Sequence, residues 1–147
     1  MPSLFDPEAR TALVSRLQRL TPDTKPAWGS LSARQMVAHV NDALRMGTGE
    51  LATASVGGPL RYPPLKQLII YLAPWPRSTP TAPELLARQP GEWAAERADF
   101  AALIGVIGTR EGATSWPDHP AFGRMSARDW GVLGWRHVDH HWRQFSI

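Results

Sequence analysis

Apolar residues recur at helical spacing in four stretches of the chain. In each stretch they fall three or four residues apart, which would make one side of a helix apolar. The four predicted helices cover residues 7–20, 33–46, 91–107 and 126–145. No stretch alternates apolar and polar residues over a sustained length, and we therefore predict no strand. The pattern indicates an all-α protein.

Three of these helices begin at recognisable signals. SARQ at residues 32–35 is a capping box, in which serine and glutamine satisfy each other's free backbone donors. SARD at residues 126–129 is similar and predicts a second start at Ser126. The third start lies at Asp6, which can cap a helix whose first residue is Pro7. Local sequence alone therefore predicts where three helices start.

The connection between the second and third predicted helices is long. Residues 54–64 and 73–83 are rich in proline, with two adjacent glycines in the first stretch, and are expected to be loops. The apolar residues 65–72 between them predict a short helix. Four helices with one long crossover predict a four-helix bundle. A length of 147 residues suits a single domain, residues 1–147, with its own apolar core.

Composition argues against several classes of function. The formal net charge is +3, yet the arginines are scattered singly, which argues against a nucleic-acid surface. The apolar residues 65–73 are too few to span a bilayer, so we expect no membrane association. The first ten residues lack the apolar core of a signal peptide, so we expect a cytoplasmic protein. Because the chain has no cysteine, a transition-metal site must use histidine and carboxylate ligands.

Histidines on the two helices with SAR starts are the candidate chemistry. His39 lies seven residues after the first capping serine, and His137 lies eleven after the second. At about 100° per residue these steps end within about 40° of each other, so both histidines are predicted on inward faces. His141, four residues after His137, shares that face and can chelate the same ion. His140 is the alternative third ligand, but the apolar stripe of the helix favours His141.

His39, His137 and His141 therefore form a predicted metal centre in the bundle core. Three neutral imidazoles leave coordination positions open for water or a substrate, which is typical of a catalytic rather than a structural site. The candidates for side chains that orient the imidazoles are Asp42, Asp139 and Gln144. Taken alone, His39 is more often a hydrogen-bonded core histidine, and only the matched faces favour a ligand.

Several residues in the connections are secondary candidates. His119 is expected to be a loop residue, with lining of the site as the alternative. Most tryptophans are expected in the core, but Trp28 and Trp116 lie in connectors and can wall a pocket. Arginines such as Arg61 and Arg77 in the proline-rich loops can hold an anionic substrate.

Three motifs bracket most of the chain. They are WGSLS leading to MVAH within residues 28–39, HPAFG at residues 119–123 and HVDHHWRQF at residues 137–145. Together they resemble the DinB-like family of bacterial four-helix metal-binding proteins, and most closely a branch of unassigned function. The resemblance implies a bundle with a long crossover that binds one divalent ion, zinc or nickel, through His39, His137 and His141. Homodimers are common in that family, and its characterised members include transferases and isomerases that use low-molecular-weight thiols.

Three functions remain open from the residues. The leading one is a metal-dependent enzyme acting on a small molecule, thiol transferase-like ahead of hydrolase-like, in which the ion lowers the pKa of a bound thiol or water. The second is a non-catalytic metal- or ligand-binding module, for instance in a stress response. This second function is favoured by the lack of a clear general base beside the histidines. The third is a structural bundle with hydrogen-bonded histidines and no metal.

Overall fold

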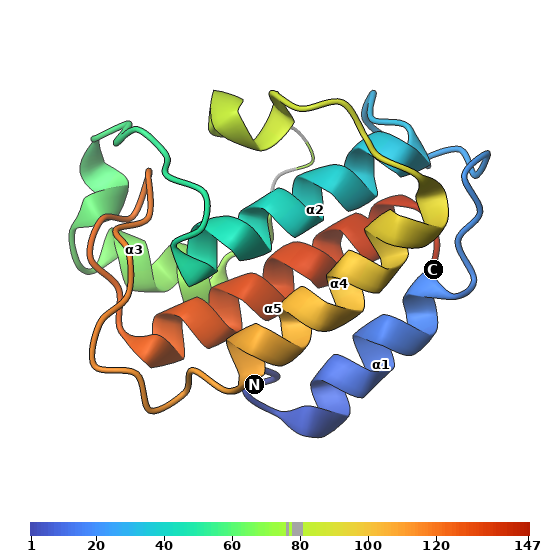
Figure 1. Ribbon diagram of the computed structural model, residues 1–147. Coiled ribbons are helices and arrows are strands. Elements are labelled where there is room, and N and C mark those ends of the chain that lie inside the picture. Colours follow the sequence, from blue (N-terminus) through green and yellow to red (C-terminus); the bar gives the residue numbers. More distant parts are fainter. Residues whose placement is uncertain (76, 78–80) are drawn as a thin grey trace.

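The computed structural model describes residues 1–75, 77 and 81–147, and these residues are all-helical (Figure 1). The α-helices are α1 (Pro7–Leu17), α2 (Ala33–Thr48), α3 (Leu65–Gln67), α4 (Trp93–Gly108) and α5 (Ala127–Gln144). The shorter turns are the 3₁₀ helices η1 (Pro59–Arg61) and η3 (Pro83–Leu86) and the π-helical turn η2 (Leu68–Leu72). No strand occurs in this described part of the chain, which confirms the predicted all-α class.

The helix starts follow the local signals in the sequence. The Asp6 carboxylate accepts a hydrogen bond from the Glu8 amide and caps α1. Both bonds of the Ser32 capping box are formed, at 2.9 Å and 3.2 Å, and Gln35 is its partner. An equivalent box between Ser126 and Asp129 starts α5. Helices α2 and α5 therefore begin with the same kind of capping box, so positions along both can be counted from equivalent serines.

The helix boundaries differ from the prediction by up to three residues, and α2 runs to Thr48 rather than to residue 46. Helix α1 ends at Leu17 rather than Leu20, because tight turns close there between Arg16 and Arg19 and between Leu17 and Leu20. Leu20 is nevertheless buried, which explains why it fits the apolar pattern. Helix α4 begins at Trp93 rather than at residue 91, because the Glu92 side chain caps it.

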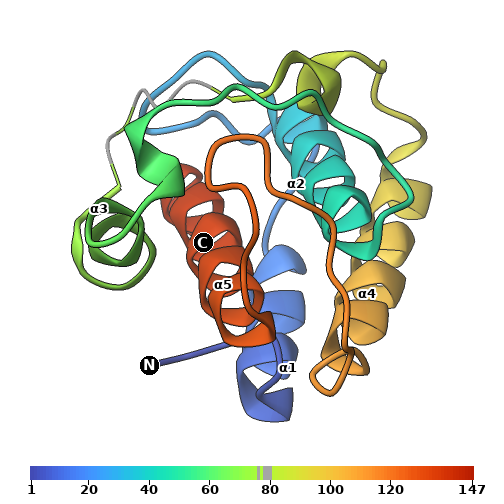
Figure 2. The same cartoon turned by 90° about the vertical axis from the view of Figure 1, so that its left-hand side faces the viewer.

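The four longer helices pack around a shared interior. Helix α2 contacts α4 and α5, and α1 contacts the same two helices from the other side (Figures 1 and 2). The Trp142 indole, fully buried, donates a 2.9 Å hydrogen bond to the carbonyl of Leu13 and ties α5 to α1. The turn η3 lies on α2, and η2 lies against α5.

Two apolar clusters fill the interior. One joins α1, α2, α4 and α5, with Leu13, Val37, Phe100, Val138 and Trp142 among its members. The other contains side chains from the C-terminal part of α2, from the N-terminal part of α5 and from the long connections. Its members include Ala43, Ile70, Leu85, Phe122 and Leu133. Along α5, His137 lies between the two clusters, whereas His39 and His141 lie next to members of the first.

Residues 65–72 form a helical segment as predicted, divided into α3 and η2. The segment ends before Pro74, and the Arg136 guanidinium donates to the free carbonyls of Ile69, Ile70 and Ala73. This contact holds the end of the segment beside α5, where Trp75 follows. The predicted loop 73–83 is described only in part, because residues 76 and 78–80 lie outside the described residues.

Among the described residues, no helix is both long enough and apolar enough to cross a bilayer.

Candidate metal centre

Helices α2 and α5 bring the three predicted ligands together. His39 is the seventh residue of α2, and His137 and His141 lie one turn apart on α5. His39 is 4% exposed and His141 is 9% exposed, whereas His137 is half-buried. The three side chains lie on the sides of α2 and α5 that face each other, as counting from the two capping boxes predicts.

The Nε2 atoms of the three histidines converge on one point. His137 Nε2 lies 3.1 Å from His39 Nε2 and 3.1 Å from His141 Nε2. Each histidine offers one nitrogen, and all three nitrogens lie within 4.8 Å of one another. With metal–nitrogen distances of about 2.05 Å, two nitrogens 3.1 Å apart would make a nitrogen–metal–nitrogen angle of about 98°. The two 3.1 Å separations therefore suit a small divalent cation, and one ion reaches all three nitrogens where those of His39 and His141 come within about 4.1 Å of each other. That the three residues bind one stays a prediction.

Hydrogen bonds to the other ring nitrogen fix two of the imidazoles. His39 Nδ1 lies 3.2 Å from the Leu85 carbonyl, which can only accept, so this nitrogen carries the proton. His141 Nδ1 lies 2.9 Å from Gln144 Oε1, and the amide nitrogen of Gln144 donates to the Trp28 carbonyl. Both rings therefore present the Nε2 lone pair to His137. A protonated second nitrogen held by a carbonyl is usual for metal-bound histidine.

Hydrogen bonds among the three histidines cannot satisfy all of the Nε2 atoms at once. The lone pairs of His39 and His141 both face one nitrogen of His137. If that nitrogen is protonated, a single N–H must serve two acceptors, and if it is not, three lone pairs face one another. A cation between the nitrogens would satisfy all three. The donor set thus fits a divalent metal.

Burial keeps these imidazoles neutral. It lowers the pKa of His141 to about 3 and lowers the pKa of His39, although the Leu85 carbonyl partly opposes the shift at His39. The pKa of His137 lies well below its ordinary value, first because of burial and then because His141 and His39 would repel a proton there. Neutral imidazole is the form that coordinates metals, so the ligands are ready at neutral pH.

The two alternative histidines lie outside the converging group. His140 lies beside His141, with ring centroids 5.4 Å apart, and contributes no nitrogen to the group. His119 is a loop residue, as expected, and its Nδ1 accepts from the backbone amides of Ala121 and Phe122. The geometry thus brings His141, rather than His140, to the other two histidines.

The residues that orient the rings were predicted only in part. Gln144 holds His141 as expected, and Gly29 makes room for it, because a side chain on Gly29 would collide with the Gln144 amide. Gly29 also has a φ of +81°, which other residues rarely adopt. The prediction that Asp42 and Asp139 orient the imidazoles was wrong, because both carboxylates form ion pairs with arginines instead.

Leu85 is the orienting residue that sequence reasoning missed. It acts through its backbone carbonyl, and every residue has one, so the side chain gives no signal. Only the position of η3 against α2 identifies it.

Aromatic side chains border the histidines. The Trp75 ring lies 5.7 Å from the ring of His137 and 5.8 Å from that of His140. Trp28 meets His140 edge to face at 6.0 Å, and the Arg77 guanidinium lies 4.8 Å from the Trp28 ring centre. The indole nitrogens of Trp28 and Trp75 are buried and have no hydrogen-bond partner among residues 1–75, 77 and 81–147. The Trp28 ring therefore lies beside His140, and the expectation that it walls a pocket stays a prediction.

Helix α2 also carries a charged cluster toward α4. Arg88 Nε donates to both carboxylate oxygens of Asp42, at 2.8 Å and 3.0 Å, and Arg88 Nη2 donates to Glu96 at 2.9 Å. Asn41 donates to the same Glu96 carboxylate at 2.8 Å. Arg88 in this way lowers the pKa of Glu96 to about 2. This cluster was not predicted from the sequence, because Arg88 and Asp42 lie 46 residues apart along the chain.

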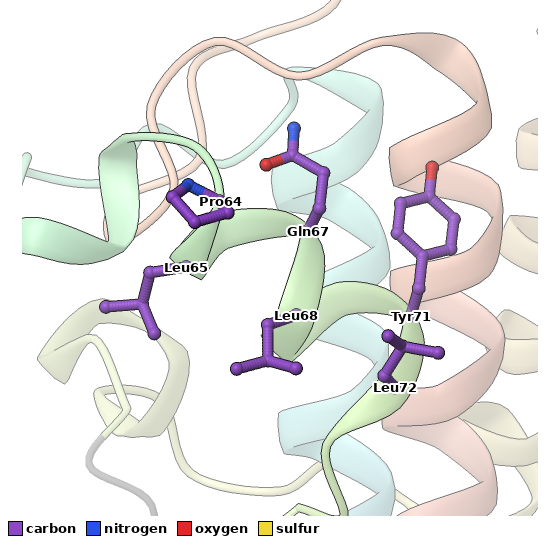
Figure 3. A pocket seen from close by; sticks show the side chains of 6 residues that line it. All are labelled: Pro64, Leu65, Gln67, Leu68, Tyr71 and Leu72. Carbon is purple, nitrogen blue, oxygen red and sulfur yellow. The ribbon is translucent and has the colours of Figure 1, made fainter.

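Two surface pockets are lined by residues other than the histidines. One, of about 530 Å³, is lined by Pro64, Leu65, Gln67, Leu68, Tyr71 and Leu72 and is almost wholly apolar (Figure 3). The other, of about 630 Å³, lies along residues 113–118 and 124–127. Trp116 lines this second pocket, so it does wall a pocket as expected, but one that contains no histidine.

The fold and site define an all-α protein with a buried group of three histidines that can hold a metal ion. Residues 6–146 match the model of DUF1569, a family of proteins of unknown function, and the chain belongs to this family. No curated protein and no solved structure matches the chain.

Proposed function

We propose that this protein binds one divalent ion, zinc or nickel, through Nε2 of His39, His137 and His141. The convergence of three Nε2 atoms, two of them held as lone-pair donors, supports the proposal. Nitrogen ligands of this kind suit zinc and nickel better than calcium or magnesium, which prefer oxygen.

Elemental analysis of purified, untagged protein tests the metal site. We expect about one equivalent of zinc or nickel in the wild type and its loss in His39→Ala and His141→Ala. His140→Ala is the matched control, because His140 lies next to His141 but outside the group, and this variant should retain the metal. A wild-type protein that contains no metal and refuses added zinc and nickel would refute the proposal. Loss of metal in His140→Ala alone would refute only the choice of third ligand.

We further propose that the fold is a DinB-like four-helix bundle with a long crossover. The support is that α1, α2, α4 and α5 each contact two others and that residues 49–92 connect α2 to α4. The resemblance also suggests a homodimer. Light scattering across a concentration series measures the mass in solution.

The best-supported activity is that of a metal-dependent enzyme acting on a small molecule, with thiol transfer ahead of hydrolysis. A bound ion would lower the pKa of a thiol or water and supply a nucleophile near neutral pH. Three protein ligands leave a coordination position for that group. Transfer of a low-molecular-weight thiol to an electrophilic acceptor, followed in metal-loaded protein and in His39→Ala, tests the activity. No turnover above that of the variant would count against it.

An anionic small molecule is the substrate class we propose. Arg61 donates to Ser55 and faces Asp118, whereas Arg77 lies over Trp28 at the edge of the site. Calorimetric titration of metal-loaded protein with acetate and with phosphate would distinguish the two kinds of anion. Arg77→Gln should weaken binding by about tenfold, the order expected for a charged hydrogen bond, and Arg61→Gln should not. Equal effects in both variants would refute the assignment.

A non-catalytic metal-binding module is the second candidate. It is favoured because, among the residues that the structure describes, the converging group contains only histidines. No carboxylate belongs to the group that could act as a general base. Replacing the native ion with cobalt(II) distinguishes the two functions. A spectrum that changes when a small thiol or anion is added shows an open position, as catalysis requires, and an unchanged spectrum favours the module.

A further inference from the structure

We propose that Arg88 is a positioning residue of the metal centre, which holds η3 against α2 so that the Leu85 carbonyl fixes the tautomer of His39. The inference rests on the proposed metal-binding function. It adds a residue that lies outside the converging histidines and acts on one of them through the backbone.

The Leu85 carbonyl determines which nitrogen of His39 is free. It lies 3.2 Å from Nδ1 and therefore leaves the lone pair on Nε2, where the other histidines converge. Yet Leu85 belongs to neither α2 nor α5. It lies in η3, a turn of four residues within the long connection, and so its position depends on contacts that fasten that turn.

Arg88, two residues beyond η3, makes such a contact. Its guanidinium donates to both oxygens of Asp42, to both oxygens of Glu96 and to the carbonyl of Ala38. Ala38 precedes His39, and Asp42 lies almost one turn after it. The planar group thus joins the chain after η3 to α2 on both sides of His39 and, at the same time, to α4. A lysine, with one compact ammonium group, cannot reproduce this double fork.

Other contacts also hold η3 in place. The Leu85 side chain is 5% exposed within the second apolar cluster, and the Glu84 carboxylate accepts from the Ala54 amide at 2.9 Å. Because these contacts remain when Arg88 is replaced, we expect weaker metal binding rather than its loss. Mutation of residues that orient metal-binding histidines typically weakens metal affinity by about 10–100-fold. Because Arg88 acts on His39 only through η3, we expect a loss near the lower end of this range.

Arg45 provides a matched control. It also donates to Asp42, at 2.9 Å, and to a second carboxylate, Asp99. Arg45 is itself part of α2, however, and its side-chain hydrogen bonds within the described part of the chain go to Asp42 and Asp99 rather than to η3. Replacing it removes an ion pair from the same cluster without releasing the turn.

The first readout is zinc affinity, measured by competition with a chromophoric chelator. We expect Arg88→Gln to bind zinc about tenfold more weakly than the wild type, Arg88→Lys to show a smaller loss, and Arg45→Gln to stay within about twofold. The double variant Arg88→Gln/Glu96→Gln removes the carboxylate charge that Arg88 balances. It keeps the test valid if Arg88→Gln alone does not fold, and it should show the same tenfold loss.

The second readout is the tautomer of His39 in metal-free protein, from the nitrogen chemical shifts of its ring. The wild type and Arg45→Gln should show the Nδ1–H form, and Arg88→Gln or the double variant should show a mixture with the Nε2–H form. Equal zinc affinities in the Arg88 and Arg45 variants, or an unchanged tautomer in both Arg88 variants, would overturn the proposal. If the wild type binds no metal, the proposed function fails, and the tautomer measurement still decides whether Arg88 positions His39.

Discussion

Helix α2 carries two buried polar groups on different sides, and they are satisfied in different ways. Toward α4, Asp42 and Glu96 face the guanidinium of Arg88, and Arg45 also pairs with Asp42, so each carboxylate has a cationic hydrogen-bond partner. Toward α5, His39 faces two more neutral histidines, and no charge in the group balances another. The carboxylates of the first group have cationic partners within the chain, whereas the second group presents converging lone pairs. Buried polar groups are normally paired, so the unpaired set is the one that calls for a ligand.

The largest effect is expected in the charged cluster. Glu96→Ala removes one of the two carboxylates that Arg88 binds and should lower the free energy of unfolding by about 3 kcal/mol, the lower end for a broken buried ion pair, because Arg88 is 34% exposed and retains Asp42. Asp99→Ala, at the exposed end of the same network, should cost less than about 1 kcal/mol. Urea denaturation of both variants measures the difference, and the folded protein should still take up one ion at saturating zinc. Equal small losses would show that the cluster contributes little as a charged group.

Adding metal should stabilise only a protein with an intact histidine group. At a zinc concentration about 100 times the Kd, binding to the folded state alone adds about 2.7 kcal/mol to the free energy of unfolding. His39→Ala should show none of this gain, and Glu96→Ala should show all of it, at a correspondingly higher zinc concentration if its affinity is weaker. Thermal denaturation with and without zinc measures both. A gain in His39→Ala would mean that the ion binds elsewhere.

The two clusters should respond to acid in separate pH ranges. In the metal-free protein the pKa of His141 falls from 6.5 to about 3, so the unfolded chain binds the extra proton between these values and stability falls as the pH is lowered through that range. By pH 5 this histidine alone accounts for about 2 kcal/mol of lost stability. The pKa of Glu96 falls from 4.5 to about 2, so its contribution is lost only below about pH 4.5. Urea midpoints from pH 7 to pH 5 should therefore fall in the wild type and fall less in His141→Asn.

The smallest effect is expected for the side chain that orients His141. Gln144→Leu removes the acceptor for Nδ1 and should weaken zinc binding about tenfold, equivalent to about 1.4 kcal/mol. Gln144→Glu retains an acceptor at the same position and should keep most of the affinity. Chelator competition measures both variants. A similar loss in both would indicate that the bond from Gln144 to the Trp28 carbonyl matters more than the tautomer of His141.

The histidine group could be anticipated because short-range rules govern its parts. The spacing of four residues brings His137 and His141 to one face of any helix. The two capping boxes start α2 and α5 in the same way, and counting from them predicts that His39 faces inward as well. Gln144 was a candidate for a similar reason, since it lies on the turn after His141. The DinB-like bundle, the identity of the metal and the reaction remain predictions.

The charged cluster and the carbonyl of Leu85 could not be anticipated. Arg88 lies 46 residues from Asp42 in sequence, and neither residue belongs to a recognisable motif. Asp42 was instead taken as a partner for histidine, because its sequence position alone did not reveal that Arg88 and Arg45 engage it. Trp75 was likewise assigned to the core in general rather than to the edge of the histidine group.

The sequence by itself determined the four longer helices, the starts of α1, α2 and α5, the inward faces of α2 and α5, and the candidate ligands, because these follow from interactions within a few residues of the chain. The tertiary structure alone decided which backbone carbonyl orients His39, which arginine neutralises Asp42 and Glu96, and which aromatic rings border the site. Those contacts depend on how the long connection packs across α2. Its irregular backbone follows no repeating pattern from which that packing could be predicted.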